Sequence, residues 1–118
     1  MAYGHLTIGI VFFTLLHCLV WFSTNTQFMD QDIKNRSLEI AMLLSIPTTL
    51  LAYYGSKFTY AALAESVWAI RFIGFGTSWL VFPVLTWVLI GESMFTPKTL
   101  ICTFLALCII SVQLFYPQ

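Results

Sequence analysis

Two side chains inside the apolar part of this chain could take part in chemistry, namely His17 and Arg71. An imidazole changes charge near neutral pH, so a histidine within an apolar run could take up and release a proton. Arginine stays positively charged and binds carboxylates and phosphates through a planar fork of N–H donors. The two residues therefore indicate proton exchange and anion binding as the chemistry open to this chain.

Each residue also has a purely structural explanation. His17 could serve only as a hydrogen-bonding group between helices. Arg71 lies about one and a half turns inside its apolar run, where it could reach the membrane surface and pair with Glu65 or with lipid headgroups. No nucleophile with a base, no phosphate-binding loop and no metal-binding spacing of the three cysteines is found in the sequence. We therefore predict a protein that is not an enzyme and uses neither a metal nor a cofactor.

The composition defines the class of protein. Of the 118 residues, 59% are hydrophobic and only 8% are charged, whereas a soluble domain has about 25% charged residues. Five basic and five acidic side chains cancel, which leaves no basic surface for a nucleic acid. The composition predicts a multi-pass integral protein of a lipid bilayer, in the inner or plasma membrane of a cell, with no nucleic-acid partner.

Four apolar runs are long enough to cross a bilayer as helices. A hydrocarbon core of roughly 30 Å needs about 20 helical residues at about 1.5 Å each. We expect spans at approximately 4–23, 39–56, 66–90 and 97–116. They predict an all-α bundle of four transmembrane helices, which uses residues 1–118 as a single domain. Both termini would then lie on the same side of the membrane.

Small and polar residues recur along one face of each span. The four faces consist of Thr7, Ile10, Thr14, His17, Trp21 and Thr24; of Ser45, Thr49, Ala52 and Ser56; of Arg71, Gly74, Ser78, Val81 and Leu85; and of Thr99, Thr103, Ala106, Ile110 and Gln113. An unpartnered polar group in hydrocarbon costs free energy, and small residues let helix backbones approach closely. We therefore expect all four faces to point inward.

Prolines and glycines predict where the helices bend and end. Pro47 and Pro83 each remove one helical hydrogen bond and should bend the second and third spans. Gly74 and Gly76 weaken the third span further. Gly91 follows the last apolar residue of that span and suits the left-handed conformation that ends a helix. Beyond Glu92, a Thr-Pro pair at 96–97 favours the start of the last helix.

The order of these features resembles the drug/metabolite transporter superfamily, whose smallest members are four-helix proteins. Glu65 and Ser66 before Trp68 are similar to the start of the third helix in small multidrug resistance proteins. Gly74-Phe75-Gly76 is similar to their glycine kink, and Gly91-Glu92 to the turn before the last helix. The resemblance implies the same four-helix fold and transport of a small solute by a dimer. Those transporters use a carboxylate in their first helix, where this chain has none and His17 is the available titratable group.

Two functions follow as hypotheses. The first is a small transporter that works as a homodimer, with His17, Trp21, Trp68 and Arg71 in contact with a solute that is anionic or neutral. The second is an accessory or structural subunit without transport activity, which packs against other subunits of a larger membrane complex. The missing acidic residue and the many aromatic side chains (11 Phe, 5 Tyr and 4 Trp) favour the second hypothesis.

Overall fold

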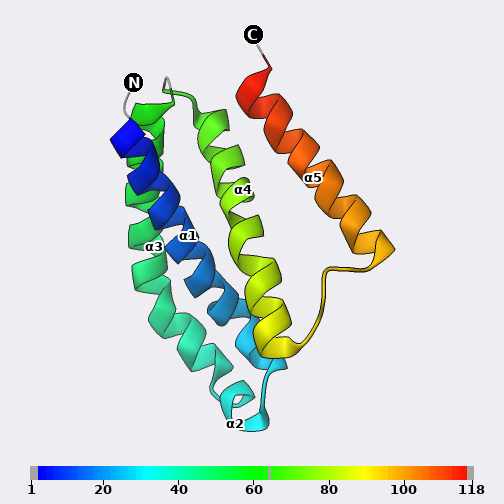
Figure 1. Cartoon of the computed structure of the whole chain (residues 1–118). Coiled ribbons are helices and arrows are strands. Elements are labelled where there is room, and N and C mark those ends of the chain that lie inside the picture. Colours follow the sequence, from blue (N-terminus) through cyan, green and yellow to red (C-terminus); the bar gives the residue numbers. More distant parts are fainter. Residues whose placement is uncertain (1–2, 64, 117–118) are drawn as a thin grey trace.

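The computed structural model describes residues 3–63 and 65–116, and its regular elements within these ranges are all helical (Figure 1). The long helices are α1 (Tyr3–Asn25), α3 (Ser37–Ala62), α4 (Val67–Leu85) and α5 (Pro97–Phe115). A π-helical segment, η2 (Thr86–Ile90), extends α4, and two short helices, η1 (Thr26–Phe28) and α2 (Gln31–Lys34), lie between α1 and α3. Within the described residues, four helical segments are long and apolar enough to cross a membrane. The all-α class and the number of candidate spans are therefore confirmed.

The four long helices run alternately up and down (Figure 1). Both ends of the chain and the α3–α4 connection lie at one end of the molecule, and the other two connections lie at the opposite end. α1 packs along α3 and against α4, and α5 packs chiefly against α4 at the edge of the molecule. The arrangement is that expected for four consecutive membrane crossings.

The predicted limits of the spans agree with the helices except in one place. The third and fourth spans match Val67–Ile90 and Pro97–Phe115 within a residue, and the first is slightly short. The second span was predicted to end near Ser56, yet α3 continues to Ala62. Gly55 and Thr59 are buried. Packing against a neighbouring helix therefore keeps the chain helical at a position where a glycine would otherwise favour the end of the helix. The helix therefore extends beyond the predicted limit of the second span.

The backbone signals of the last two helices are confirmed. Gly91 is left-handed with φ 84°, and its N–H donates to the carbonyls of Thr86 and Trp87 at 3.0 Å each. Thr96 caps α5 by accepting a hydrogen bond from the Thr99 N–H at 3.3 Å, with Pro97 in the first turn. The α-helices continue through both internal prolines, and the π-helical segment begins three residues after Pro83. Gly74 and Gly76 likewise lie within continuous helix.

Gly91→Ala is expected to lower the free energy of unfolding by about 1 to 2 kcal/mol, because a side chain is strained in the left-handed region. Gly74→Ala is the matched control, since a Cβ there meets nothing within 4 Å. The control should be neutral or stabilising by up to about 1 kcal/mol, because alanine is a better helix former. Pulse proteolysis across an SDS titration measures both variants. Equal stability of Gly91→Ala and the wild type would contradict the prediction.

The inward faces of α1 and α3 differ from those predicted. Gly9 packs directly against Thr59, and Gly55 packs against the ring of Phe13. The predicted face of α3 is wrong in part, because Ser45 and Thr49 are exposed and donate to carbonyls of their own helix, whereas Gly55, Thr59 and Ala62 are buried. On α1, the predicted face is correct around His17 and Trp21, while Thr7 and Thr24 are exposed. The closest pair of small residues decides the rotation of each helix.

The predicted face of α5 is confirmed, and that of α4 is confirmed in part. Ala106 is buried, and Ile110 contacts the position of Gly76 at 3.5 Å. Thr99, Thr103 and Gln113 on the same face are half-buried. On α4, Val81 is buried, Gly74 and Ser78 are half-buried, and Arg71 is exposed. The buried stripe of α4 consists instead of Ala69, Thr77 and Val81.

Candidate functional site

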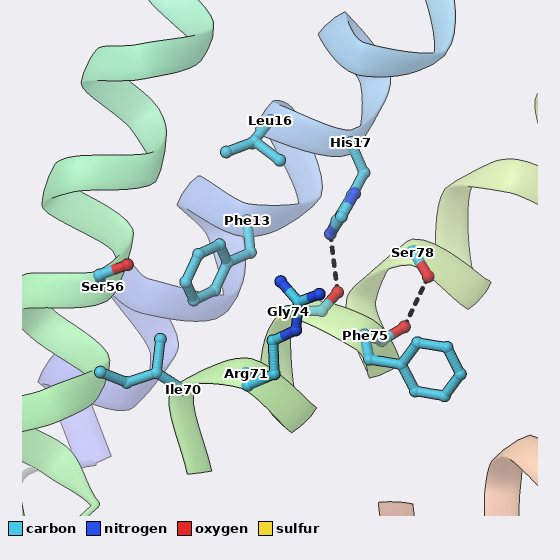
Figure 2. A pocket seen from close by; sticks show the side chains of 9 residues that line it. All are labelled: Phe13, Leu16, His17, Ser56, Ile70, Arg71, Gly74, Phe75 and Ser78. Atoms are coloured by element: carbon cyan, nitrogen blue, oxygen red, sulfur yellow. Dashed lines mark hydrogen bonds between the residues drawn. The ribbon is translucent and has the colours of Figure 1, made fainter. Parts of the chain in front are cut away.

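A cavity of about 390 Å³ lies between α1, α3 and α4 (Figure 2). Its wall is mostly apolar and carries a few polar side chains that point into it. The lining consists of Phe13, Leu16, His17, Ser56, Ile70, Arg71, Gly74, Phe75 and Ser78. The cavity therefore brings together His17 and Arg71, the two residues for which the sequence predicts proton exchange and anion binding.

His17 links α1 to α4 across this cavity. Its Nε2 lies 2.7 Å from the carbonyl oxygen of Gly74 (Figure 2). Because a carbonyl can only accept, Nε2 carries the proton and donates. The hydroxyl of Thr77 donates to the same carbonyl at 2.9 Å. His17 thus has the hydrogen-bonding role between helices that one reading of the sequence predicted, while its ring also forms part of the cavity wall.

The positive charge and the N–H donors of Arg71 are not used by other described residues. Its side chain extends from α4 along the cavity wall (Figure 2), and it forms no hydrogen bond or ion pair with another described residue. Glu65, in the turn before α4, does not pair with Arg71. The other predicted partner, a lipid headgroup, stays a prediction. A guanidinium that has no partner among the described residues keeps its N–H donors available for a carboxylate or a phosphate.

The hydroxyl groups around the cavity differ in what they can offer a ligand. Ser78 donates to the carbonyl of Phe75 at 2.5 Å, so its proton is in use. The Ser56 hydroxyl forms no hydrogen bond within the part of the chain that the structure describes. Ser56 and Arg71 are therefore the polar groups of the lining with free donors.

Trp21 is placed for packing rather than for contact with a solute. Its side chain is 2% exposed, and its indole N–H donates to the Thr86 hydroxyl at 2.9 Å. The ring also borders a smaller hollow of about 230 Å³ that includes His17. The hydrogen bond joins α1 to the π-helical segment, 65 residues away in sequence.

Trp68 does not lie in either hollow, which corrects its predicted place beside His17. It is 69% exposed, and its ring stacks on Phe72 with centroids 6.3 Å apart. Neighbouring residues of a helix point about 100° apart, and it is the next residue, Ala69, that is buried. The identity of a tryptophan near a helix end does not reveal which of these directions faces inward.

The sequence reasoning missed Thr86 and the phenylalanines of the cavity. Thr86 follows Pro83 by three residues, at the point where the α-helix gives way to π-helix. Such irregular turns free backbone groups and redirect side chains, so a hydroxyl residue shortly after a proline was the available signal. No sequence signal pointed to Phe13 and Phe75, because phenylalanine is frequent throughout the chain.

Comparison with protein-family models, with curated proteins and with solved structures gives no match. The resemblance to drug/metabolite transporters therefore depends on the number and spacing of the predicted spans and on the short motifs around Trp68, Gly74-Phe75-Gly76 and Gly91-Glu92.

Proposed function

We propose that this chain is an integral protein of the inner or plasma membrane and that it moves a small solute across it as a homodimer. The cavity between α1, α3 and α4 is the binding site in this proposal. Its volume of about 390 Å³ lies within the range of about 300 to 1,000 Å³ for small-molecule sites. The observation that carries the proposal is an arginine that has no partner among residues 3–63 and 65–116 and lies in the wall of a cavity bounded by helices of membrane-spanning length.

The dimer is supported by the position of α5. This helix packs chiefly against α4, and large side chains such as Ile101, Phe104 and Val112 cover its outer surface. A second copy could bury this surface and close the open side of the bundle. The basic residues are nearly balanced between the two ends of the molecule, so their distribution does not oppose insertion in both orientations.

His17 couples the site to the packing of the helices. A movement of α4 relative to α1 that exposes the cavity to the other side would have to break the bond between His17 and the Gly74 carbonyl. Solute binding beside Arg71, three residues before Gly74 on the same stripe of α4, could then shift the balance between the two arrangements.

An accessory subunit is the second candidate function. Gln113 lies half-buried on α5, and its amide forms no hydrogen bond with another described residue. A primary amide inside a membrane span is commonly satisfied by a neighbouring helix, at about 0.6 to 2 kcal/mol. Such a partner could belong to another protein. Native mass measurement after gentle extraction separates the two candidates, since a homodimer favours transport and other subunits in fixed ratio favour the accessory role.

Flux through liposomes tests the transport proposal directly. Proteoliposomes loaded with a mixture of anionic, neutral and cationic metabolites should lose at least one solute faster than empty liposomes, as measured by mass spectrometry. Arg71→Gln is expected to slow that loss about tenfold, which equals about 1.4 kcal/mol of lost binding. His17→Ala should slow it as well, because the link between α1 and α4 is lost.

Lys98→Gln serves as the control, because Lys98 lies in the exposed first turn of α5, outside the cavity lining. Its flux should equal that of the wild type. Equal flux for the wild type, Arg71→Gln and His17→Ala would argue against the proposed site.

A further inference from the structure

A groove along α3 adjoins the cavity that contains Arg71. The groove has a volume of about 600 Å³, and every residue of its lining except one belongs to α3. It consists of Thr49, Ala52, Tyr53, Ser56, Lys57, Tyr60 and Ile70. Ser56 and Ile70 line both the groove and the cavity. The two hollows are therefore neighbours with a shared wall.

The combined lining carries positive charge and no negative charge. Lys57 lies in the groove and Arg71 in the cavity, and neither forms an ion pair with a described residue. Among the described residues that line the two hollows there is no Asp or Glu, and Glu65 of the nearby turn lines neither. The groove and the cavity thus each contain one cation that is unpaired among the described residues. This arrangement favours an anionic ligand that moves from the groove to the cavity.

The apolar part of the lining determines the rest of the ligand. Phe13, Leu16 and Phe75 line the same cavity as Arg71, and their rings and methyl groups suit a hydrocarbon body. The Nε2 proton of His17 is already donated to Gly74, so in this tautomer the imidazole offers an anion no free N–H. The negative group of a ligand therefore belongs at Arg71.

We infer that the solute is an amphipathic organic monoanion, a carboxylate with an apolar body, which reaches the cavity sideways along the α3 groove. This inference rests on the proposed transport function. Arg71 binds the carboxylate with its two-pronged guanidinium, and Lys57 with Tyr60 attracts it at the outer part of the groove. A single guanidinium neutralises a single charge, so a dianion would keep an uncompensated charge in an apolar surrounding. A molecule of this kind dissolves partly in lipid and can meet the groove from the bilayer.

Ligands with matched tails test the head group. The full-length chain is placed in nanodiscs of neutral phosphatidylcholine, and binding of octanoate is compared with that of octylammonium, 1-octanol, octyl phosphate and acetate. Octanoate should bind at least tenfold more tightly than each of the other four. Octanol binding as tightly as octanoate would overturn the inference, because the tail alone would then explain binding. Acetate binding as tightly would overturn it as well, because the apolar body would have no role.

Variants test the two cations and the passage. Arg71→Gln should weaken octanoate binding at least tenfold, and Arg71→Lys should fall between it and the wild type because the charge stays but the fork is lost. Lys57→Gln should slow association about threefold at low salt with little change in dissociation, while Lys98→Gln should change neither rate. In Ser56→Leu the larger side chain should obstruct the route from the groove to the cavity and weaken octanoate binding at least threefold. The control is Ser45→Leu, since Ser45 is exposed on the same helix and lines neither hollow.

Thermal unfolding of each variant shows whether it is folded before its binding is compared. Unchanged octanoate affinity in both Arg71→Gln and Arg71→Lys would overturn the inference. Loss of octanoate binding in nanodiscs that contain phosphatidylglycerol, together with copurification of that lipid, would also overturn it, because the groove would then hold a lipid. Octanoate that binds but is not transported would overturn only the transport function. Arg71-dependent flux of a neutral or cationic solute without octanoate binding would keep transport and overturn the ligand class.

Discussion

Gly9→Leu is expected to lower the free energy of unfolding by about 3 kcal/mol, the upper part of the range for overpacked cores. Even a Cβ at this position would overlap the Thr59 hydroxyl, and it would lie 3.3 Å from the Thr59 nitrogen and 3.4 Å from the Gly55 carbonyl oxygen. Thr59 is 0% exposed, and a β-branched side chain in a helix has few other rotamers. A leucine must therefore push α1 away from α3. Pulse proteolysis across an SDS titration measures the loss.

Gly4→Leu is the matched control, because Gly4 lies in the same helix and a Cβ there meets nothing within 4 Å. Its effect should stay within about 0.5 kcal/mol, as is usual for surface substitutions. Gly9→Ala should be destabilising to a smaller degree, and the added change Thr59→Ala should restore part of the loss by removing the overlapping hydroxyl. Equal stability of Gly9→Leu and Gly4→Leu would show that α1 and α3 do not pack at this point.

The second large effect is expected from the hydrogen bond between Trp21 and Thr86. Thr86→Val leaves the Trp21 N–H buried without an acceptor, which costs about 1 to 3 kcal/mol. Trp21→Phe loses the donor and part of the ring, so we expect about 3 kcal/mol. Both side chains are buried, at 2% and 8% exposure, so water cannot replace the missing partner. Pulse proteolysis again gives the free energy, because it does not depend on tryptophan fluorescence.

A double-mutant cycle isolates this bond. The pair Trp21→Phe and Thr86→Val should be less destabilising than the sum of the single changes, by about 0.5 to 3 kcal/mol. Trp68→Phe and Thr103→Val are the controls, since Trp68 is exposed and Thr103 donates to the Thr99 carbonyl of its own helix. Strictly additive effects in the cycle would mean that the two side chains do not interact.

The candidate site was partly visible in the sequence. His17 and Arg71 are rare polar groups in apolar runs, and such groups turn toward protein because lipid cannot satisfy them. Both residues line one cavity, where His17 is half-buried and Arg71 remains exposed. The same reasoning failed for Trp68, because an indole near a helix end is equally stable at the membrane–water interface. It also overlooked Lys57, which lines the groove only because α3 continues past Gly55.

The helical class, the number of candidate spans, the turn at Gly91 and the start of α5 at Thr96 are all predictable from the amino-acid sequence. These depend on run length, hydropathy and local hydrogen bonding, which each segment expresses alone. Three features emerge only when the helices pack, namely the rotation of α1 and α3, the length of α3 and the hydrogen bond between Trp21 and Thr86. Lipid is as apolar as a packed helix surface. Hydrophobicity therefore cannot show which face of a span points inward. That orientation depends on pairs such as Gly9 and Thr59, which pack directly against each other.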